Sequence, residues 1–313
     1  MRPTVRPTGF IPPLCTPLTP DGAVDTRSLH RLVEHVLDGG ASALFALGTC
    51  GEAVFLTDEQ RRTVVRTAVE AAGGRVPVLA GVIDTTTPRV LERAREAAGL
   101  GADVLVATAP FYTDTHPAET ADHFRRVRAE TGLPLLAYDI PSRVHTKLPP
   151  AVLLELAEDR TLVGLKDSSG DLDTLRHLLV ALRRRGLDRR FSVLTGSELT
   201  ADAALLIGAD GVVAGLGNVD PAAYTRLHTH ATAGRWPEAV TEQNRLTTLQ
   251  TLTRAADPAT MSGTAAAVGA YKAALELLGV IDCRATATPL RPLPQESVEE
   301  VRRRLEEGGL LPG

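Results

Sequence analysis

The chain has 313 residues, of which 43% are hydrophobic and 23% are charged, and its formal net charge is −4. This composition is typical of a soluble globular protein with a large core, and the negative charge without a basic stripe argues against nucleic-acid binding. No apolar run is long enough to span a membrane, the start MRPTVRPTGF lacks the apolar core of a signal peptide, and the three cysteines lack metal-type spacing. We therefore expect a cytoplasmic protein without a metal or another cofactor.

Eight short apolar segments alternate with longer segments of helical pattern. The predicted strands are residues 9–14, 43–47, 76–82, 104–107, 133–138, 162–166, 191–195 and 211–214. The predicted helices that follow them are residues 26–37, 57–72, 87–99, 117–130, 150–158, 172–185, 198–207 and 221–234. Several of the strands are almost continuously apolar, which is typical of a parallel sheet buried on both faces.

Glycine recurs where a predicted helix meets the next strand. The sequences GGA at 39–41, GLGAD at 99–103 and GAD at 208–210 each precede a strand, and glycine there closes the helix in a left-handed conformation. Eight repeated units of this kind predict a (β/α)8 TIM barrel over residues 1–234. An open doubly wound sheet is the alternative, but CTPLTPDG after the first strand is not a glycine-rich phosphate fingerprint.

The pattern changes after residue 234. Residues 236–256, 262–278 and 296–306 are predicted as three helices without intervening strands. We interpret residues 235–313 as a C-terminal helical extension. The sequence leaves open whether it packs on the barrel or serves an oligomer interface.

Lys166 ends the sixth predicted strand, and it is one of only three lysines among 34 basic residues. A lysine there is unusual because burial penalises its charged form. Unlike arginine, lysine can lose its proton and act as a nucleophile. The alternative is a lysine that pairs with a carboxylate or extends to solvent. Asp167 should not neutralise it, because consecutive strand residues face opposite sides.

The ends of neighbouring strands carry further candidates, because barrel enzymes place their sites there. GTCGE at 48–52 predicts a sharp turn whose amides and Thr49 hydroxyl hold a small carboxylate, although a plain capped turn is the alternative. Tyr138 is a candidate proton relay or a core residue, and Arg143 a candidate carboxylate ligand or a surface ion pair. His145 and Lys147 are interpreted as solvated loop residues. Together the candidates predict attack by neutral Lys166 on a ketone and a Schiff-base intermediate.

Four motifs carry a resemblance to a known family. GTCGE (48–52), YDIPSR (138–143), GLKDSSGD (164–171) and GADGVVAGLGNV (208–219) resemble motifs of the dihydrodipicolinate synthase/N-acetylneuraminate lyase family of class I pyruvate aldolases, and the resemblance covers nearly the whole chain. It implies that Lys166 forms the Schiff base with pyruvate and that Tyr138 relays protons. It further implies that Thr49 lies between Tyr138 and Tyr112, and that Tyr112 reaches across a tight dimer into the neighbour's site.

The resemblance also assigns substrate contacts and an assembly. Gly48 and Cys50 would hold the pyruvate carboxylate, the Val213 carbonyl and Gly215 would face the imine, and Arg143 would bind the carboxylate of the second substrate. The implied partners are pyruvate and an aldehyde-type small molecule. The implied assembly is a homotetramer of two tight dimers.

The departures from the family pattern concern the substrate and regulation. Cys50 replaces the second threonine of the synthases, which removes one hydroxyl from the carboxylate cradle. Asp58, Arg61 and Phe111 stand where lysine-regulated synthases carry histidines and a tyrosine, so lysine feedback is not expected. KDSSGD and GLGN are closer to the sugar-acid aldolases, whereas Arg143 favours the synthases.

The predicted function is a synthase-like condensation of pyruvate with an aldehyde. A 2-keto-3-deoxy sugar-acid aldolase or an N-acetylneuraminate lyase-like enzyme is the alternative. Two further alternatives are a catalytically inert small-molecule-binding barrel and a barrel enzyme whose GLGN glycines bind a phosphorylated substrate.

Overall fold

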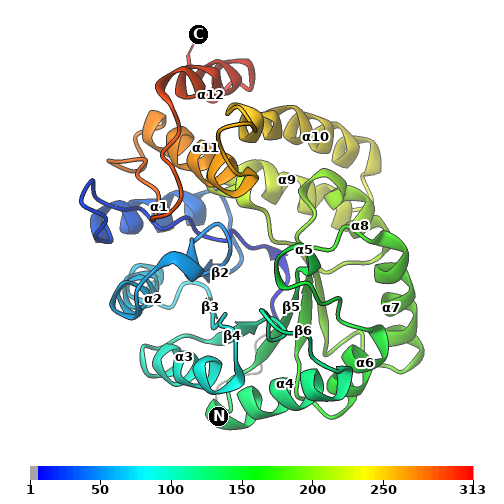
Figure 1. Ribbon diagram of the computed structural model, residues 1–313. Helices are drawn as coiled ribbons and strands as arrows, with labels where there is room; N and C mark the ends of the chain where they lie inside the picture. The colour runs from blue at the N-terminus through cyan, green and yellow to red at the C-terminus, as the bar shows by residue number, and fades with distance from the viewer. Residues whose placement is uncertain (1–5, 313) are drawn as a thin grey trace.

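Eight parallel strands curl into a barrel at the centre of the computed structural model, which describes residues 6–312 (Figure 1). The strands are β1 (Gly9–Phe10), β2 (Leu44–Ala46), β3 (Val78–Gly81), β4 (Val104–Ala107), β5 (Leu135–Asp139), β6 (Gly164–Asp167), β7 (Ser192–Thr195) and β8 (Gly211–Val212). They are hydrogen-bonded in the order β1-β8-β7-β6-β5-β4-β3-β2. A parallel bridge between Pro13 and Phe45 joins the segment after β1 to β2 and closes the barrel. The predicted (β/α)8 barrel is confirmed.

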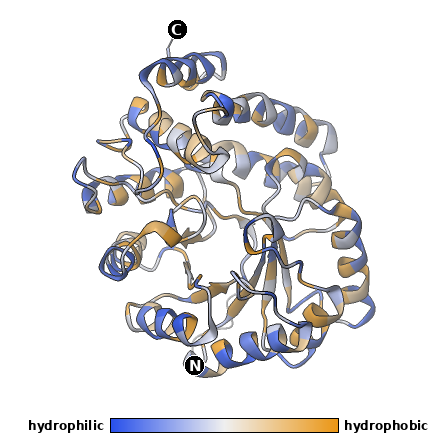
Figure 2. Ribbon diagram, in the orientation of Figure 1, coloured by the Kyte–Doolittle hydropathy of each residue, from blue (hydrophilic) through white to orange (hydrophobic). Residues whose placement is uncertain are grey.

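Helices alternate with the strands and form the outer layer. They are α1 (Thr26–Asp38), α2 (Asp58–Ala72), α3 (Thr87–Gly99), α4 (Pro117–Thr131), α5 (Pro141–Val144), α6 (Pro150–Glu158), α7 (Leu172–Arg184), α8 (Ala201–Ile207) and α9 (Pro221–Thr232). Short 3-10 helices follow three strands: η1 (Ala53–Phe55), η2 (Glu198–Thr200) and η3 (Gly215–Asn218). The hydropathy colouring of Figure 2 shows apolar residues in the central strands and polar residues on the outer helices.

Side chains alternate along each strand between the barrel interior and the layer under the helices. In β5, Leu136 and Tyr138 belong to the interior cluster, whereas Leu135 and Ala137 pack against the helices. Because β5 and β6 pair in parallel register with Tyr138 opposite Lys166, the lysine side chain enters the interior beside the tyrosine.

The predicted glycine closures are present. Gly40, Gly101 and Gly208 have φ angles of 89°, 95° and 110°, in the left-handed region that glycine adopts without strain. Each of them leads directly into the next strand, so the repeated junction sets the spacing of the barrel units.

Three predicted elements differ locally from the structure. The predicted strand 9–14 is regular only at β1, because Pro12 and Pro13 have no N–H to donate to a ladder. The predicted helix 198–207 divides into η2 and α8, and the short helix α5 lies in a segment predicted as a loop.

The C-terminal residues form a helical extension that packs on the barrel. It consists of α10 (Trp236–Leu249), η4 (Gln250–Arg254), α11 (Gly263–Leu277) and α12 (Gln295–Glu307), so the helix predicted over 236–256 tightens into a 3-10 turn after Leu249. Figure 1 shows α10 and α11 beside α9 and α1 at one side of the barrel, with α12 outermost. Within residues 6–312, none of the helices combines the length and apolar character that a membrane span requires.

Candidate active site

The Lys166 side chain lies inside the barrel and is 5% exposed. Its Nζ lies over the Tyr138 ring, 3.8 Å from the ring centroid, and 5.0 Å from the centroid of Phe45. In the described part of the chain no carboxylate oxygen comes within 4.0 Å of this Nζ. Asp167 faces the helix layer instead, as predicted, where its Oδ2 is 3.7 Å from the Lys147 Nζ. The Lys166 amine is thus buried among aromatic faces without an acidic partner.

Tyr138 and Thr49 form a hydrogen-bonded pair beside this amine. The Tyr138 Oη and the Thr49 Oγ1 are 3.1 Å apart, and either hydroxyl can be the donor. The Tyr138 ring is held edge-on against Phe45, with the ring planes at 80°. A fixed phenol that is hydrogen-bonded to a second hydroxyl can pass a proton toward or away from a group bound at Lys166.

Most of the predicted site residues line one cavity of about 260 Å³. It is lined by Thr49, Cys50, Tyr138, Arg143, Lys166, Val213 and Gly215. An adjoining apolar chamber of about 200 Å³ is lined by Gly48 and shares Thr49, Tyr138 and Arg143 with the first. Nowhere in residues 6–312 do three histidine, cysteine, aspartate or glutamate side chains gather as a metal ion would require.

Tyr112 is the predicted site residue that lies apart from the others. Its side chain is 92% exposed, its φ angle is 83°, and it lines neither chamber. Its own chain therefore gives it no contact with Lys166, and its reach into a neighbouring subunit remains a prediction.

The glycines of GTCGE differ in role from the prediction. The left-handed residues of this turn are Leu47 and Glu52, with φ angles of 58° and 56°, rather than the glycines. Gly48 and Gly51 are required by close packing. A Cβ at Gly48 would lie 2.8 Å from the Phe45 ring, and one at Gly51 would lie 2.9 Å from the Leu14 carbonyl oxygen.

Cys50 is half-buried and packs closely on the glycine-rich loop after β8. A Cβ on Gly215 would lie 2.8 Å from its Sγ. Burial, and secondarily the nearby Glu198 carboxylate, raises the pKa of the Cys50 thiol to about 12. The thiol is therefore neutral at physiological pH, so it offers a bound carboxylate only a weak S–H donor.

Three polar residues of the cavity wall were not foreseen: Glu198 on η2, Gln250 on η4 and Tyr271 on α11. Glu198 Oε1 accepts from the Leu216 N–H at 2.7 Å, and Oε2 accepts from the Tyr271 hydroxyl at 3.1 Å and Gln250 Nε2 at 3.0 Å. Burial raises the pKa of Glu198, and these donors oppose the rise. The sequence predicted only helices for the extension, and its periodicity cannot tell which face meets the cavity.

The interpretation of Lys147 as a solvated loop residue is wrong. Its ammonium forms an ion pair with the Asp139 carboxylate and donates to Ser169 Oγ at 3.1 Å. The signal available in the sequence was the rarity of lysine, which singled out Lys147 as well as Lys166.

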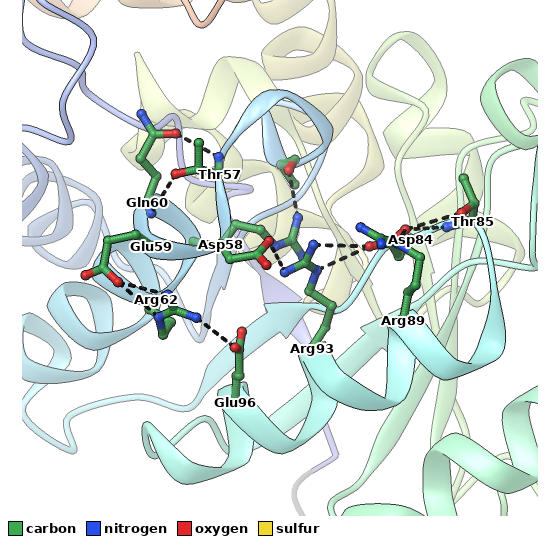
Figure 3. Close-up of polar contacts among 12 residues, drawn as sticks. Thr57, Asp58, Glu59, Gln60, Arg62, Asp84, Thr85, Arg89, Arg93 and Glu96 are labelled. Carbon is green, nitrogen blue, oxygen red and sulfur yellow. Dashed lines mark hydrogen bonds and ion pairs between the residues drawn. The ribbon is translucent and has the colours of Figure 1, made fainter.

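The positions compared with lysine-regulated synthases are engaged in contacts within the protein. Asp58 pairs with Arg93, which also contacts Asp84 at 3.2 Å between α2 and α3 (Figure 3). The buried Arg61 donates to the carbonyl oxygens of Ala53 at 2.7 Å and Gly81 at 3.0 Å. Arg61 thereby anchors the turn that follows GTCGE.

Comparisons with known proteins agree with one another. The model of the dihydrodipicolinate synthetase family matches residues 6–308. The 4-hydroxy-tetrahydrodipicolinate synthase of Stenotrophomonas maltophilia (strain R551-3) is 37% identical over 235 residues, which cover 73% of this chain and 77% of that protein.

Two solved structures illustrate the similarity of fold. The dihydrodipicolinate synthase of Bacteroides thetaiotaomicron superposes with a TM-score of 0.89 and 30% identity over 96% of this chain and 98% of the other. YagE, a prophage protein of the dihydrodipicolinic acid synthase family from E. coli K12 in complex with pyruvate, gives a TM-score of 0.88 and 27% identity over 97% and 99%.

Proposed function

The chain belongs to the dihydrodipicolinate synthetase family, and on that premise we propose that it joins pyruvate to an aldehyde through a lysine Schiff base, in the manner of 4-hydroxy-tetrahydrodipicolinate synthase. The observation that carries the proposal is the buried amine of Lys166, which shares one cavity with the Tyr138–Thr49 pair and Arg143. The names of the relatives and the pyruvate complex of YagE support it.

The chemistry follows from the position of the amine. The neutral Lys166 nitrogen attacks the ketone carbon of pyruvate, a C–N bond forms, and the ketone oxygen leaves as water. The imine withdraws electrons, so the pyruvate methyl group loses a proton and its carbon attacks the aldehyde. Hydrolysis of the imine then returns the free lysine. The Tyr138 hydroxyl, relayed by Thr49, moves the protons of these steps.

The remaining cavity residues have binding roles in this scheme. The Thr49 hydroxyl and the turn at Gly48 and Cys50 hold the pyruvate carboxylate, while the Val213 carbonyl and Gly215 face the imine. Arg143 borders both chambers, so its guanidinium can meet the carboxylate of a second substrate that enters after pyruvate.

A 2-keto-3-deoxy sugar-acid aldolase is the second candidate, and the polar wall of Glu198, Gln250 and Tyr271 favours it. These side chains offer both donors and acceptors within the Lys166 cavity, which suits an aldehyde that carries hydroxyl groups. Comparison of kcat/KM for aspartate semialdehyde with that for hydroxylated aldehydes, at saturating pyruvate, decides between the two.

We extend the proposal to a cytoplasmic homotetramer built from two tight dimers. Support comes from Tyr112 and Val54, large apolar side chains that are 92% and 59% exposed. Sedimentation equilibrium of the wild type should give a tetramer, and Y112A should lower turnover in the assembled enzyme. A monomeric wild type with full activity contradicts this part of the proposal.

Borohydride trapping tests the central proposal. Pyruvate and borohydride together should add one reduced pyruvate to the protein, and peptide mass mapping should place it on Lys166. Neither reagent alone should do so, and K166M should remain unmodified. An unchanged intact mass, or equal labelling of K166M, refutes the Schiff-base function and favours an inert binding barrel.

A further inference from the structure

Two carboxylates follow the proposed catalytic residues Tyr138 and Lys166 by one position along β5 and β6. In the register of β5 and β6, Tyr138 pairs with Lys166, and the next pair is Asp139 with Asp167. The tyrosine and lysine face the barrel interior, whereas the aspartates face the helix layer. Asp139 is 0% exposed and Asp167 is 4% exposed. Two like charges opposite each other on adjacent strands repel, and burial strengthens the repulsion.

Lys147 lies across this acidic pair. Its Nζ contacts the Asp139 carboxylate, lies 3.7 Å from Asp167 Oδ2 and donates to Ser169 Oγ at 3.1 Å. We call these four residues the Lys147 clamp. It joins the end of β5 to the end of β6 one residue beyond Tyr138 and Lys166.

The same contacts close the loop that carries Arg143. The chain leaves β5 at Asp139, forms α5 and returns at Lys147 and Leu148. The Leu148 N–H donates to Asp139 Oδ1 at 3.2 Å, and Lys147 binds the other oxygen of that carboxylate. One buried aspartate therefore holds both ends of the Arg143 loop.

We propose that Lys147 is a positioning residue of the active site, which holds Tyr138, Lys166 and the Arg143 loop in register by bridging Asp139 and Asp167. The inference rests on the proposed function, because it concerns how the Schiff-base lysine is placed. Small displacements of reacting groups cost about a hundredfold in rate, so a device that fixes two strand ends has catalytic consequences.

The charges around the clamp predict what removal of Lys147 does. Burial raises the pKa of Asp139, and the Lys147 ammonium opposes the rise. The other charged groups nearby are Asp167, Asp171 at the start of α7, and Lys166 on the opposite face of β6. Hydrogen bonds from Thr174 lower the pKa of Asp171, and Lys147 adds a smaller lowering effect. Without Lys147, the Asp139 and Asp167 carboxylates would lie on adjacent strands with no ammonium between them, so their repulsion would be unopposed.

The rate of borohydride-trapped adduct formation on Lys166 tests the clamp. K147M should slow trapping by about tenfold or more, whereas K147R, which retains the charge, should stay within about threefold of the wild type. R176M, which removes an exposed arginine of α7, is the matched control and should leave the rate unchanged.

A double-mutant cycle with Asp139 separates repulsion from a general loss of structure. D139N keeps an acceptor for Leu148 and removes one charge, so K147M/D139N should react faster than K147M. The trapping rate of K147M should also depend on pH through the ionisation of Asp139, and that of K147M/D139N should not. Circular dichroism should show that every variant is folded. Should K147M not fold, D139N alone should slow trapping severalfold.

The two proposals fail in different ways. Absence of an adduct in the wild type overturns the Schiff-base function and the clamp with it. If the wild type reacts normally and K147M reacts within twofold of it, the clamp alone is overturned. If K147M does not fold, an unimpaired trapping rate in D139N has the same meaning. Equal rates for K147M and K147M/D139N also contradict it, because relief of the carboxylate repulsion is its defining consequence.

Discussion

At the scale of single residues, each of the three lysines has its own task inside the protein. The role proposed for Lys166 needs a nitrogen that can become a neutral nucleophile, which arginine does not provide. Lys272 is 0% exposed, forms an ion pair with Glu52 and donates to the Ala285 carbonyl oxygen at 2.7 Å. Lys147 bridges two carboxylates from a partly buried loop. A compact ammonium fits each of these places, whereas arginine supplies 31 of the 34 cations (34 − 3).

Removal of the Tyr138 hydroxyl should separate its proton transfer from its packing. Y138F keeps the ring against Phe45 and over Lys166, so the fold and pyruvate entry should persist, but kcat should fall about 100-fold. T49V removes the partner hydroxyl and should act on the same step, so Y138F/T49V should be little slower than Y138F. Steady-state kinetics measure both effects. Wild-type kcat in Y138F, or fully additive losses, would argue against a shared relay.

Cys50 should behave as an unreactive thiol. Because burial raises its pKa to about 12, its thiolate fraction at pH 8 is about 10³-fold below that of an ordinary cysteine. Iodoacetamide labelling of Cys50, followed by peptide mass spectrometry, should be correspondingly slow and should still increase at pH 10, where an ordinary thiol has levelled off. C50S identifies the labelled peptide, and urea-unfolded protein gives the reference rate. A plateau near pH 9 in the folded protein contradicts the raised pKa.

At the scale of elements, a buried histidine connects α4 to the neighbouring βα unit. His123 is 2% exposed, and its Nδ1 lies 3.0 Å from the Thr87 Oγ1 at the start of α3. Burial lowers its pKa to about 4, against a weaker opposing contribution from the Thr108 backbone. The folded state therefore keeps this ring neutral at pH values where the unfolded chain protonates it.

This histidine should make stability fall as the pH falls below 6.5. In that range the unfolded state binds the proton and the folded state does not, and the loss ends near pH 4, where the folded state also binds it. Between pH 7 and pH 5 the wild type should lose about 2 kcal/mol more unfolding free energy than H123F. Urea titrations at both pH values measure this difference, with H177Q on the surface of α7 as control. Parallel losses in wild type and H123F contradict it.

Helices and strands could be predicted where one physical signal in the sequence was strong. They could not be predicted where contacts with other elements determine the local structure. Apolar runs with glycine closures located all eight strands, since the left-handed turns at Gly40, Gly101 and Gly208 demand that residue. Helix α5 has four residues, too few for a helical period to register. The 3-10 turn at η4 depends on packing against α11 and α12, which no local pattern encodes.

At the scale of the molecule, barrel topology explains how much of the candidate site could be predicted. Side chains at strand ends converge in any such barrel, so Thr49, Tyr138 and Lys166 could be placed together from the sequence. The wall formed by Gln250 and Tyr271 comes from the extension, and its orientation follows from tertiary contacts between distant segments. Those contacts also make the extension part of the cavity wall.

One buried ion pair links the extension to the GTCGE turn, where the pyruvate carboxylate is proposed to bind. Glu52 ends the GTCGE motif, and Lys272 lies in the middle of α11; both side chains are fully buried. The other carboxylate oxygen of Glu52 accepts from the Ala287 N–H at 2.6 Å. Since Glu52 also adopts a left-handed φ of 56°, the turn that presents Thr49 and Cys50 depends on contacts made by residues more than two hundred positions away.

Loss of one partner of this pair should therefore weaken the whole molecule and the cradle together. K272M leaves the Glu52 charge buried and unpaired, so the free energy of unfolding should fall by about 3–5 kcal/mol. E52Q/K272M removes both charges and should be more stable than K272M, because no uncompensated ion remains. Urea unfolding measures the stabilities, and the KM for pyruvate should rise in K272M even under conditions where the protein is fully folded. If E52Q/K272M is no more stable than K272M, the pair is not the electrostatic link between barrel and extension that the structure indicates.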